Sequence, residues 1–381
     1  MRFDNAILYK ITRQVLKKEM TLLLKSLVEM FQNLKYSVGL DIDKRFIHAC
    51  IVKIDIQQKV TIIAQSKFNN TAKGHIDLQN WITKKSKQKE VTLKICVEAT
   101  GVYHESISLF LHQAGYQISI VLPNKSKQYM KALGLKSKND KIDARGLAQM
   151  GAEQNLDIWQ PAAQEYYELK ALCRHKERLE NMMTDIRNQL ESVTHSVFPN
   201  DQVINSLEDL MKKLKEQAKD IKKQIEVIVR NTKTDLGQKA ELIMSIPGVG
   251  PLIAATVLSE TNGFAQFHNE RQLVSYSGYD VIQNQSGNRK GRTKISKKGN
   301  SHIRRLMHIG AWQMVMQDVT HLKNLYERVY ERTGIKMKAY VAVQRKLLCI
   351  IFALVKKGEK FDSQYNLQSE EITKAEEPQV L

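Results

Sequence analysis

Four acidic residues stand where a carboxylate is costly to place, and together they could hold divalent metal ions. Asp41 interrupts an apolar run, Glu98 ends another, and Asp140 and Asp143 stand three residues apart near the start of a helical pattern. A carboxylate beside apolar side chains is tolerated when a metal ion or a cationic group compensates for its charge. Taken alone, Asp41 could instead cap a strand end, and the pair of aspartates could be an ordinary acidic first turn of a helix.

The surrounding pattern predicts a mixed α/β sheet that would position these acids. Three apolar strand patterns follow one another, and helices then alternate with two further strands. This order favours an antiparallel start and a parallel continuation, as in a ribonuclease-H-like sheet. The expected strands are 36–42, 47–53, 60–66, 92–97 and 117–122, with helices at 75–86 and 103–114.

Within such a sheet the four acids would meet at one edge. Glu98 lies at the carboxyl end of its strand, where open α/β sheets place their sites. Asp140 and Asp143 share one face of a helix because they are three residues apart. Two Mg²⁺ ions about 3.5–4 Å apart could then align a water or a hydroxyl with a phosphodiester.

A basic, glycine-containing loop spans residues 278–305, with eight Lys and Arg residues against the single acid Asp280. Such loops are often merely solvated, but this one could also contact a nucleic-acid backbone. The candidate contacts are Arg289, Lys290, Arg292, Lys294, Lys297, Lys298, Arg304 and Arg305.

The same loop offers hydroxyl groups that could attack a phosphodiester. Ser286 precedes a glycine, and Ser296 and Ser301 have similar basic surroundings. Nearby guanidinium and ammonium groups could stabilise the charge that develops on the phosphate. Residue type alone does not choose among the three serines.

Gly248 and Gly250 form a short turn between two apolar helical segments at 245–255. In helix-hairpin-helix modules such a turn offers backbone N–H groups to a phosphate. The same turn also occurs between packed helices that bind nothing.

Composition indicates an anionic partner and a protein of several domains. The 381 residues include 59 Lys and Arg against 40 Asp and Glu, a formal net charge of +19. Nucleic acid is the first candidate partner. No apolar run reaches the roughly 18 residues needed to cross a membrane. Four widely spaced cysteines in apolar or helical surroundings suggest reduced core residues of a cytoplasmic protein.

The pattern along the chain predicts five segments. A strand-free region with two apolar stripes at three-to-four spacing indicates a helical hairpin or coiled coil. The segments are a basic helical extension at 1–35, the α/β domain at 36–160, the coiled-coil hairpin at 161–237, a mainly helical domain at 238–360 and a disordered acidic tail at 361–381.

Five motifs in this order resemble the DEDD transposases of the one-hundred-and-ten family of insertion sequences, over about residues 36 to 355. They are GLDIDK at 39–44, VEATGVYHE at 97–105, NDKIDARGLA at 139–148, IPGVGPLIAA at 246–255 and SGNRKGRTKISKKGNSHIRRLM at 286–307. The resemblance implies a Holliday-junction-resolvase-like domain, a coiled-coil insertion and a transposase domain with a nucleophilic serine.

Matched motif by motif, the resemblance implies that Asp41, Glu98, Asp140 and Asp143 bind Mg²⁺ and that Ser286 is the nucleophile. It further implies donor and target DNA as substrates, a bridge RNA as guide, and dimers that pair into tetramers. The expected setting is the nucleoid of a bacterium or an archaeon.

Two other functions fit parts of the same sequence. A metal-dependent junction nuclease would use water and the four acids without a serine. A nucleic-acid-binding scaffold would use only the positive charge and the hairpin, and its acids would be structural.

Overall fold

A computed structural model of the chain describes Met20 and residues 33–86, 92–99, 101–134, 139–282, 285–286, 289–290 and 294–362. It divides into two compact units, unit 1 up to Pro161 and unit 2 from Ala162 onward. Apart from Met20 and the last few residues before 36, the predicted extension at 1–35 lies outside the described residues. The predicted tail lies outside them from residue 363.

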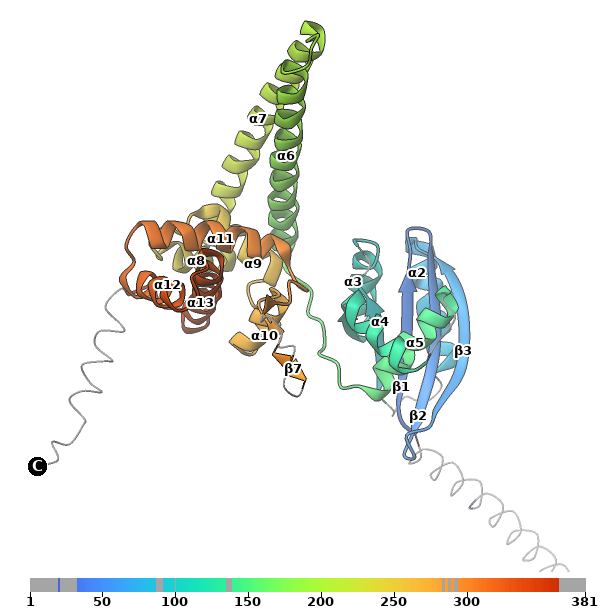
Figure 1. The fold of residues 1–381 in the computed structure, drawn as a ribbon. Helices are drawn as coiled ribbons and strands as arrows, with labels where there is room; N and C mark the ends of the chain where they lie inside the picture. Colours follow the sequence, from blue (N-terminus) through green and yellow to red (C-terminus); the bar gives the residue numbers. More distant parts are fainter. Residues whose placement is uncertain are drawn as a thin grey trace, which may run out of the picture. The chain divides into compact units, whose positions relative to one another are not determined.

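Unit 1 is built on a five-stranded mixed sheet (Figure 1). The strand order is β3-β2-β1-β4-β5; β1 to β3 form an antiparallel meander, and β4 and β5 continue the sheet parallel to β1. The predicted ribonuclease-H-like sheet is therefore confirmed. Its strands are β1 (Asn33–Ile42), β2 (Phe46–Asp55), β3 (Val60–Asn69), β4 (Leu93–Glu98) and β5 (Gln117–Val121).

Helices cover both faces of this sheet. The first face packs against α2 (Ala72–Lys85) and α3 (Glu105–Gln113) through an extensive apolar cluster. The second face packs against α5 (Asp140–Glu153) and, at the side of β4 and β5, α4 (Pro123–Ala132). Successive side chains along each strand point to opposite faces, so each face presents its own set of residues to the helices that cover it.

Unit 2 is helical, and α9 (Pro251–Thr261) lies at its centre. Every residue of α9 from Ile253 to Thr261 is buried. The helices around it are α6 (Gln164–Thr194), α7 (Asp201–Val229), α8 (Asp235–Met244), α10 (Glu270–Tyr276), α11 (Ser301–Met316), α12 (Thr320–Thr333) and α13 (Lys336–Lys357).

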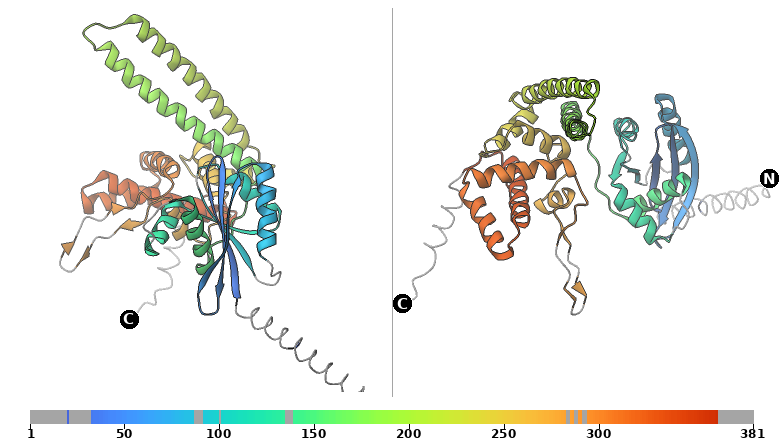
Figure 2. Two further views of the ribbon diagram at one scale, coloured as in Figure 1. Left: turned by 90° about the vertical axis from the view of Figure 1, so that its right-hand side faces the viewer. Right: turned by 45° about the horizontal axis from the view of Figure 1, so that its top comes forward.

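The two longest helices, α6 and α7, lie side by side as a hairpin that extends from this helical body (Figures 1 and 2). Along the hairpin Leu179, Ile186, Met211 and Leu214 form a small apolar cluster of their own. At the base, side chains of both helices enter the main core of unit 2 together with α9. The hairpin is thus anchored in the helical body rather than linked to it by a flexible joint.

The basic region after α10 contains short paired strands where the sequence indicated only a loop. They are β6 (Val281–Ile282) with β9 (Lys294–Ile295), and β7 (Gln285–Ser286) with β8 (Arg289–Lys290). We call residues 280–296 the arm. Figures 1 and 2 show its described strands extending away from the helices of unit 2. Within the described ranges, no helix has both the length and the apolar character needed to cross a membrane.

Candidate active site

The second face of β1 is built so that α5 can lie directly on it. Gly39 makes this possible, because a Cβ there would lie 2.1 Å from both the Ala144 carbonyl oxygen and the Ala148 nitrogen. One turn further along α5, a Cβ on Gly151 would lie 2.4 Å from Ser37 Oγ. Asp41 comes next on the same face as Ser37 and Gly39, since side chains two apart on a strand share a face. The close packing therefore directs the start of α5 toward Asp41.

Strand register brings two further side chains to the same end of this face. In the parallel pair Leu40 lies opposite Val97, so Asp41 and Glu98 occupy the next register position. In the antiparallel pair Asp41 lies directly opposite His48. Asp41, Glu98 and His48 thus come from three adjacent strands.

The first turn of α5 supplies the remaining two acids. Asn139 caps this helix, with its side-chain oxygen accepting a hydrogen bond of 2.9 Å from the Ile142 N–H. The cap fixes the start of the helix, so Asp140 and Asp143 both lie in the first turn. Asp140 is exposed and Asp143 is half-buried.

The electrostatics of Asp41 indicate that the four acids converge. Burial, followed by the negative charges of Asp143, Asp140, Glu98 and the nearby Asp43, raises the pKa of Asp41 from 3.8 to about 7. A carboxylate behaves in this way when it is partly removed from water among like charges. The sequence placed these four acids at one edge of the sheet, and the strand register and charge coupling agree with that placement.

Two polar side chains support the acids and were not identified from sequence. Ser126, fully buried on α4, donates a 2.5 Å hydrogen bond to Glu98 Oε2. His48 Nε2 lies 3.3 Å from Asp140 Oδ2, although neither ring nitrogen makes a well-aligned hydrogen bond within the described chain. The sequence feature that could have identified His48 is the tight turn between β1 and β2, which sets it opposite Asp41. Ser126 is far from Glu98 in sequence and had no comparable signal.

Asp43 has the structural role that the sequence also allowed for Asp41, because it caps the end of a strand. Its Oδ1 accepts hydrogen bonds from the N–H groups of Arg45 and Phe46, at 2.5 and 2.7 Å, and so closes the turn between β1 and β2. Slight burial opposes ionisation, but these backbone bonds hold the pKa of Asp43 below its usual value. Asp43 is a turn residue, whereas no hydrogen bond from the described part of the chain lowers the pKa of Asp41 in this way.

The donor set of the four acids suits a hard divalent cation. Carboxylate oxygens are the ligands that Mg²⁺ prefers, and a cation would relieve the repulsion that Asp41 experiences. Within the described ranges no group of three His, Cys, Asp or Glu side chains is already close enough to hold a metal ion. The acids are therefore brought together but not drawn into a closed cage.

The arm carries the candidate serine and lies in unit 2. The backbone at Ser286 pairs with Arg289, while the side chains of Ser286, Arg289 and Lys290 lie outside the described part of the chain, as does the whole of Arg292. Ser296 is engaged in the fold, since its hydroxyl donates to the Gly278 carbonyl at 3.3 Å and accepts from the Lys298 N–H at 3.2 Å.

The basic side chains near the arm fall into two groups. Lys294, Lys297 and Lys298 are exposed. Arg304 instead donates to the Ser277 carbonyl at 2.9 Å, and Arg305 forms ion pairs with two acids of α6. The exposed lysines are available to an anionic partner as they stand, whereas the two arginines already contribute to the fold.

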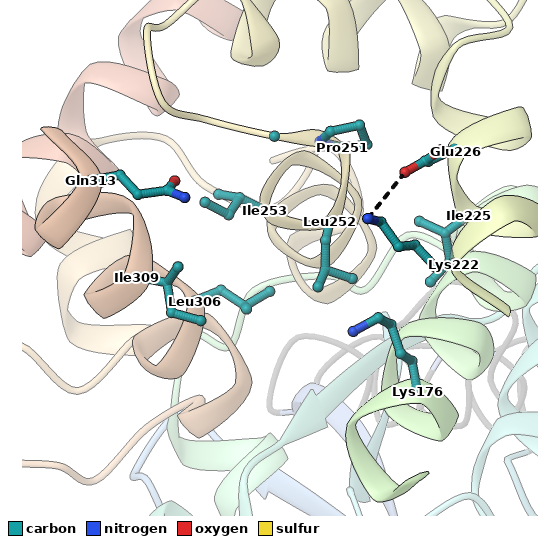
Figure 3. Close-up of a pocket in the computed structure, with 11 residues that line it drawn as sticks. Lys176, Lys222, Ile225, Glu226, Pro251, Leu252, Ile253, Leu306, Ile309 and Gln313 are labelled. Carbon is teal, nitrogen blue, oxygen red and sulfur yellow. Dashed lines mark ion pairs between the residues drawn. The ribbon is translucent and has the colours of Figure 1, made fainter. Parts of the chain in front are cut away.

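The Gly248 turn joins α8 to α9. Gly248 has a φ of +78°, in the left-handed region that favours glycine, and Gly250 caps α9 ahead of Pro251. Gly250 also lines a pocket of about 300 Å³ whose walls are mostly apolar, including Leu252 and Leu306 (Figure 3). The predicted phosphate contact at this turn remains a prediction.

Comparison with known proteins gives the family. A model named for the DEDD transposases of IS110 and described as a transposase matches residues 38–199, which contain all four acids. A model described as the transposase IS116/IS110/IS902 family matches residues 240–327, which contain the turn and the arm. The chain belongs to the IS110 family of transposases.

Relatives of this IS110-family transposase carry two kinds of name. A pilin gene-inverting protein of Moraxella lacunata is 27% identical over 329 residues, covering 86% of this chain and 98% of that protein. The transposase for insertion sequence element IS1111A of Coxiella burnetii is 24% identical, covering 70% of this chain and 79% of that protein. Among solved structures, Thermus thermophilus RuvC aligns with a TM-score of 0.26 and 11% identity, over 32% of this chain and 99% of that chain.

Proposed function

We propose that this IS110-family transposase cuts and rejoins DNA through a covalent serine intermediate. Ser286 is the nucleophile, and Asp41, Glu98, Asp140 and Asp143 form the site for two Mg²⁺ ions. Donor and target DNA are the substrates, and a bridge RNA selects them. The observation that supports this proposal is the register that sets Asp41 beside Glu98, together with the pKa of Asp41, which burial and then the charges of the other three acids raise.

Placing these like charges near one another lowers the stability of the folded protein when no cation is bound. Burial and then the like charges around Asp41 raise its pKa to about 7, so part of the cluster is protonated near neutral pH without a cation. Perturbed acids of this kind concentrate at functional sites. Bound Mg²⁺ would supply the charge that ionises the cluster and that stabilises a phosphodiester during displacement.

The proposed reaction conserves phosphodiester bonds. The Ser286 hydroxyl attacks phosphorus and releases its proton, while the DNA oxygen on the other side of the phosphorus leaves and takes up a proton. A hydroxyl of the second DNA strand then attacks the phosphoserine and restores the serine. One P–O bond forms for each that breaks, which fits the absence of a Walker-type GxxxxGK[ST] sequence in the chain.

The contacts of Ser296 favour Ser286 as the nucleophile. Ser296 Oγ already donates to one backbone group and accepts from another at the base of the arm. A hydroxyl held in this way would have to break both contacts in order to attack. Ser286 stands further out in the arm, in strand β7 where it pairs with β8, rather than at its base.

Support for nucleic-acid partners comes from charge and from the relatives. The net charge of +19 favours polyanions, and the exposed lysines near the arm are suited to backbone phosphates. Relatives are named for gene inversion and for transposition, both of which move a DNA segment. The bridge RNA, the dimers that pair into tetramers and a site combining the acids of one subunit with the serine of another follow from the family resemblance.

The test is to trap the intermediate. The protein is purified from its host, RNA that accompanies it is sequenced, and the complex is incubated with labelled duplexes that span the ends of its element. We expect a protein–DNA adduct that survives denaturation, is lost in Ser286→Ala and persists in the matched control Ser296→Ala. Cleavage that continues in Ser286→Ala without an adduct would indicate a water-dependent junction nuclease. Normal binding without any reaction would indicate a scaffold.

A further inference from the structure

Backbone hydrogen bonds join the two segments that flank the arm, next to the β6–β9 pair. The Lys297 N–H donates to the Gly278 carbonyl at 3.1 Å, and the Asn300 N–H donates to the Tyr276 carbonyl at 2.8 Å. Gly299 lies against the same backbone, since a Cβ there would lie 2.4 Å from the Tyr276 carbonyl oxygen. The arm therefore leaves the body of unit 2 from a closed base rather than as a free loop.

Asn300 has two roles at this base. Its side-chain oxygen accepts a 3.0 Å hydrogen bond from the Ile303 N–H and so caps α11. Because the oxygen is committed to the cap, the amide nitrogen must point the other way. That nitrogen donates to Glu260 Oε2 at 2.7 Å.

Glu260 is a carboxylate in the middle of the core of unit 2. Its side chain is only 1% exposed. Arg174 of α6 binds it in a bidentate manner, at 2.7 Å from Nε and 3.0 Å from Nη2, and Lys170 Nζ lies 4.0 Å away. The Tyr276 hydroxyl donates to the Glu260 carbonyl oxygen at 2.9 Å, so the backbone of the same residue also contacts the base of the arm.

These contacts form a chain from the hairpin to the arm. Arg174 belongs to α6, Glu260 to α9, and Asn300 to the base of the arm. We infer that Glu260 is a positioning residue that couples the α6–α7 hairpin to the arm and so sets where Ser286 is presented. The inference rests on the proposed role of Ser286 and adds to it a residue that does not touch DNA.

A carboxylate suits this position better than an amide. Bidentate pairing with a guanidinium and a hydrogen bond from Asn300 require acceptors on both carboxylate oxygens. Desolvation opposes ionisation of Glu260, yet Arg174, Lys170 and Asn300 together hold its pKa below the usual value. Glutamine has only one acceptor oxygen, so it cannot keep both hydrogen bonds from Arg174 together with the one from Asn300.

This geometry allows a rescue experiment. Glu260→Gln turns an N–H₂ group toward Arg174 Nε, or toward both Arg174 Nη2 and Asn300, so the network loses one or two of its three hydrogen bonds. Asn300→Asp keeps the cap of α11 but sets a second carboxylate against Glu260. In the double variant the amide introduced at position 260 donates to the carboxylate introduced at position 300, so this hydrogen bond forms again in the opposite direction. Arg174 Nε keeps its acceptor in the same variant, so position 260 again links α6 to the base of the arm.

The experiment measures adduct formation by the full-length protein with its RNA in single turnover, on labelled duplexes that span the element ends. The amplitude reports how much protein is competent, and the rate constant reports how well the serine is positioned. We expect each single variant to lose about 10- to 100-fold in rate constant at near-normal amplitude, because a misplacement of about 1 Å has an effect of this size. The double variant should recover to within a few-fold of wild type.

A second measurement does not require formation of the protein–DNA adduct. Hydrogen exchange of the peptide covering residues 294–300 should accelerate in each single variant and slow again in the double variant. Asp235→Asn is the matched control, because Asp235 also ties α6 to another helix through Tyr166, at 2.9 Å, and pairs with Lys239 of α8. That control should change neither the rate constant nor the exchange at 294–300.

The outcomes separate the inference from the proposed function. An adduct that persists in Ser286→Ala would overturn the proposed nucleophile and, with it, the inference. An adduct that depends on Ser286 but forms at wild-type rate in Glu260→Gln would overturn the inference alone. Loss of amplitude at an unchanged rate constant, or absence of rescue in the double variant, would show that Glu260 serves only stability.

Discussion

Two carboxylates in this transposase, one half-buried and one almost completely buried, have pKa values shifted in opposite directions. Asp41 of unit 1 is surrounded by other acids, and its pKa rises to about 7. Glu260 of unit 2 is almost completely buried, yet Arg174, Lys170 and Asn300 keep its pKa low. Burial raises the pKa of both residues, so it does not explain the opposite directions. What separates them is the charge of their neighbours: Arg174, Lys170 and Asn300 act on Glu260, whereas the charges that act on Asp41 are those of other acids.

The largest expected effect follows from replacing Asp41. Asp41→Asn should reduce recombination by roughly a thousandfold or more, as loss of an essential active-site group does. The same change removes one like charge from the cluster, so the free energy of unfolding should not fall and should rise by about 0.5–2 kcal/mol. Adduct yield and urea denaturation measure the two effects. A large loss of stability would make Asp41 a structural residue like Glu260.

A loss of stability is instead expected when Glu260 loses its bidentate partner Arg174. Arg174→Met should lower the free energy of unfolding of unit 2 by about 3 kcal/mol, because the buried Glu260 loses its bidentate partner and keeps only Asn300 and the more distant Lys170. Arg305→Met removes a guanidinium that pairs with Glu177 and Glu180 near the surface, and this matched change should cost about 1 kcal/mol or less. Equal losses in the two variants, measured by urea denaturation, would remove the distinction between buried and exposed pairs.

The packing that assembles the acid cluster can be broken without touching an acid. Gly39→Ala places a Cβ within 2.1 Å of backbone atoms of α5, so α5 or β1 must move. We expect a loss of about 3 kcal/mol in the stability of unit 1, at the upper end of overpacking effects. Gly250→Ala is the control, because its Cβ would meet nothing within 4 Å. The melting temperatures of both variants measure the two effects. A Gly39→Ala variant as stable as Gly250→Ala would contradict this interpretation of the packing.

The smallest effect is a pH dependence confined to unit 1. Between pH 3.8 and about 7 the folded protein holds the Asp41 proton more tightly than the unfolded chain, so the free energy of unfolding should fall as pH rises through this range and then level off. Trp81 and Trp159 report on unit 1, and Trp312→Phe removes the tryptophan of unit 2. Urea titrations in EDTA should show this slope in wild type but not in Asp41→Asn, and a divalent cation should reduce it. An identical slope in both proteins would assign it to another group.

The sheet was predictable because its signals are local. Strand alternation and the order of strands and helices gave the mixed sheet, and acids at strand ends and in a helical first turn gave the cluster. The four acids could therefore be placed at one edge before any contact was known. His48 required only the register of one hairpin in addition, which the tight turn at Asp43 sets.

Contacts between distant elements could not be predicted in the same way. Ser126 and Glu98 are 28 residues apart, and Arg174 and Glu260 are 86 apart, with no periodicity that relates them. Arg304 and Arg305 were predicted to contact nucleic acid from their charge, and that prediction stands beside contacts within unit 2 that the sequence did not reveal. Their hydrogen bonds to the Ser277 carbonyl and to acids of α6 depend on how the helices of unit 2 pack.

The account depends most directly on whether divalent cations bind among the four acids of unit 1. Anomalous diffraction from crystals of the full-length protein grown with Mn²⁺ would measure this. We predict ions bound by Asp41 together with Glu98, Asp140 and Asp143, and none there in Asp41→Asn. Crystals without a bound ion, in which these carboxylates face different directions, would contradict the account.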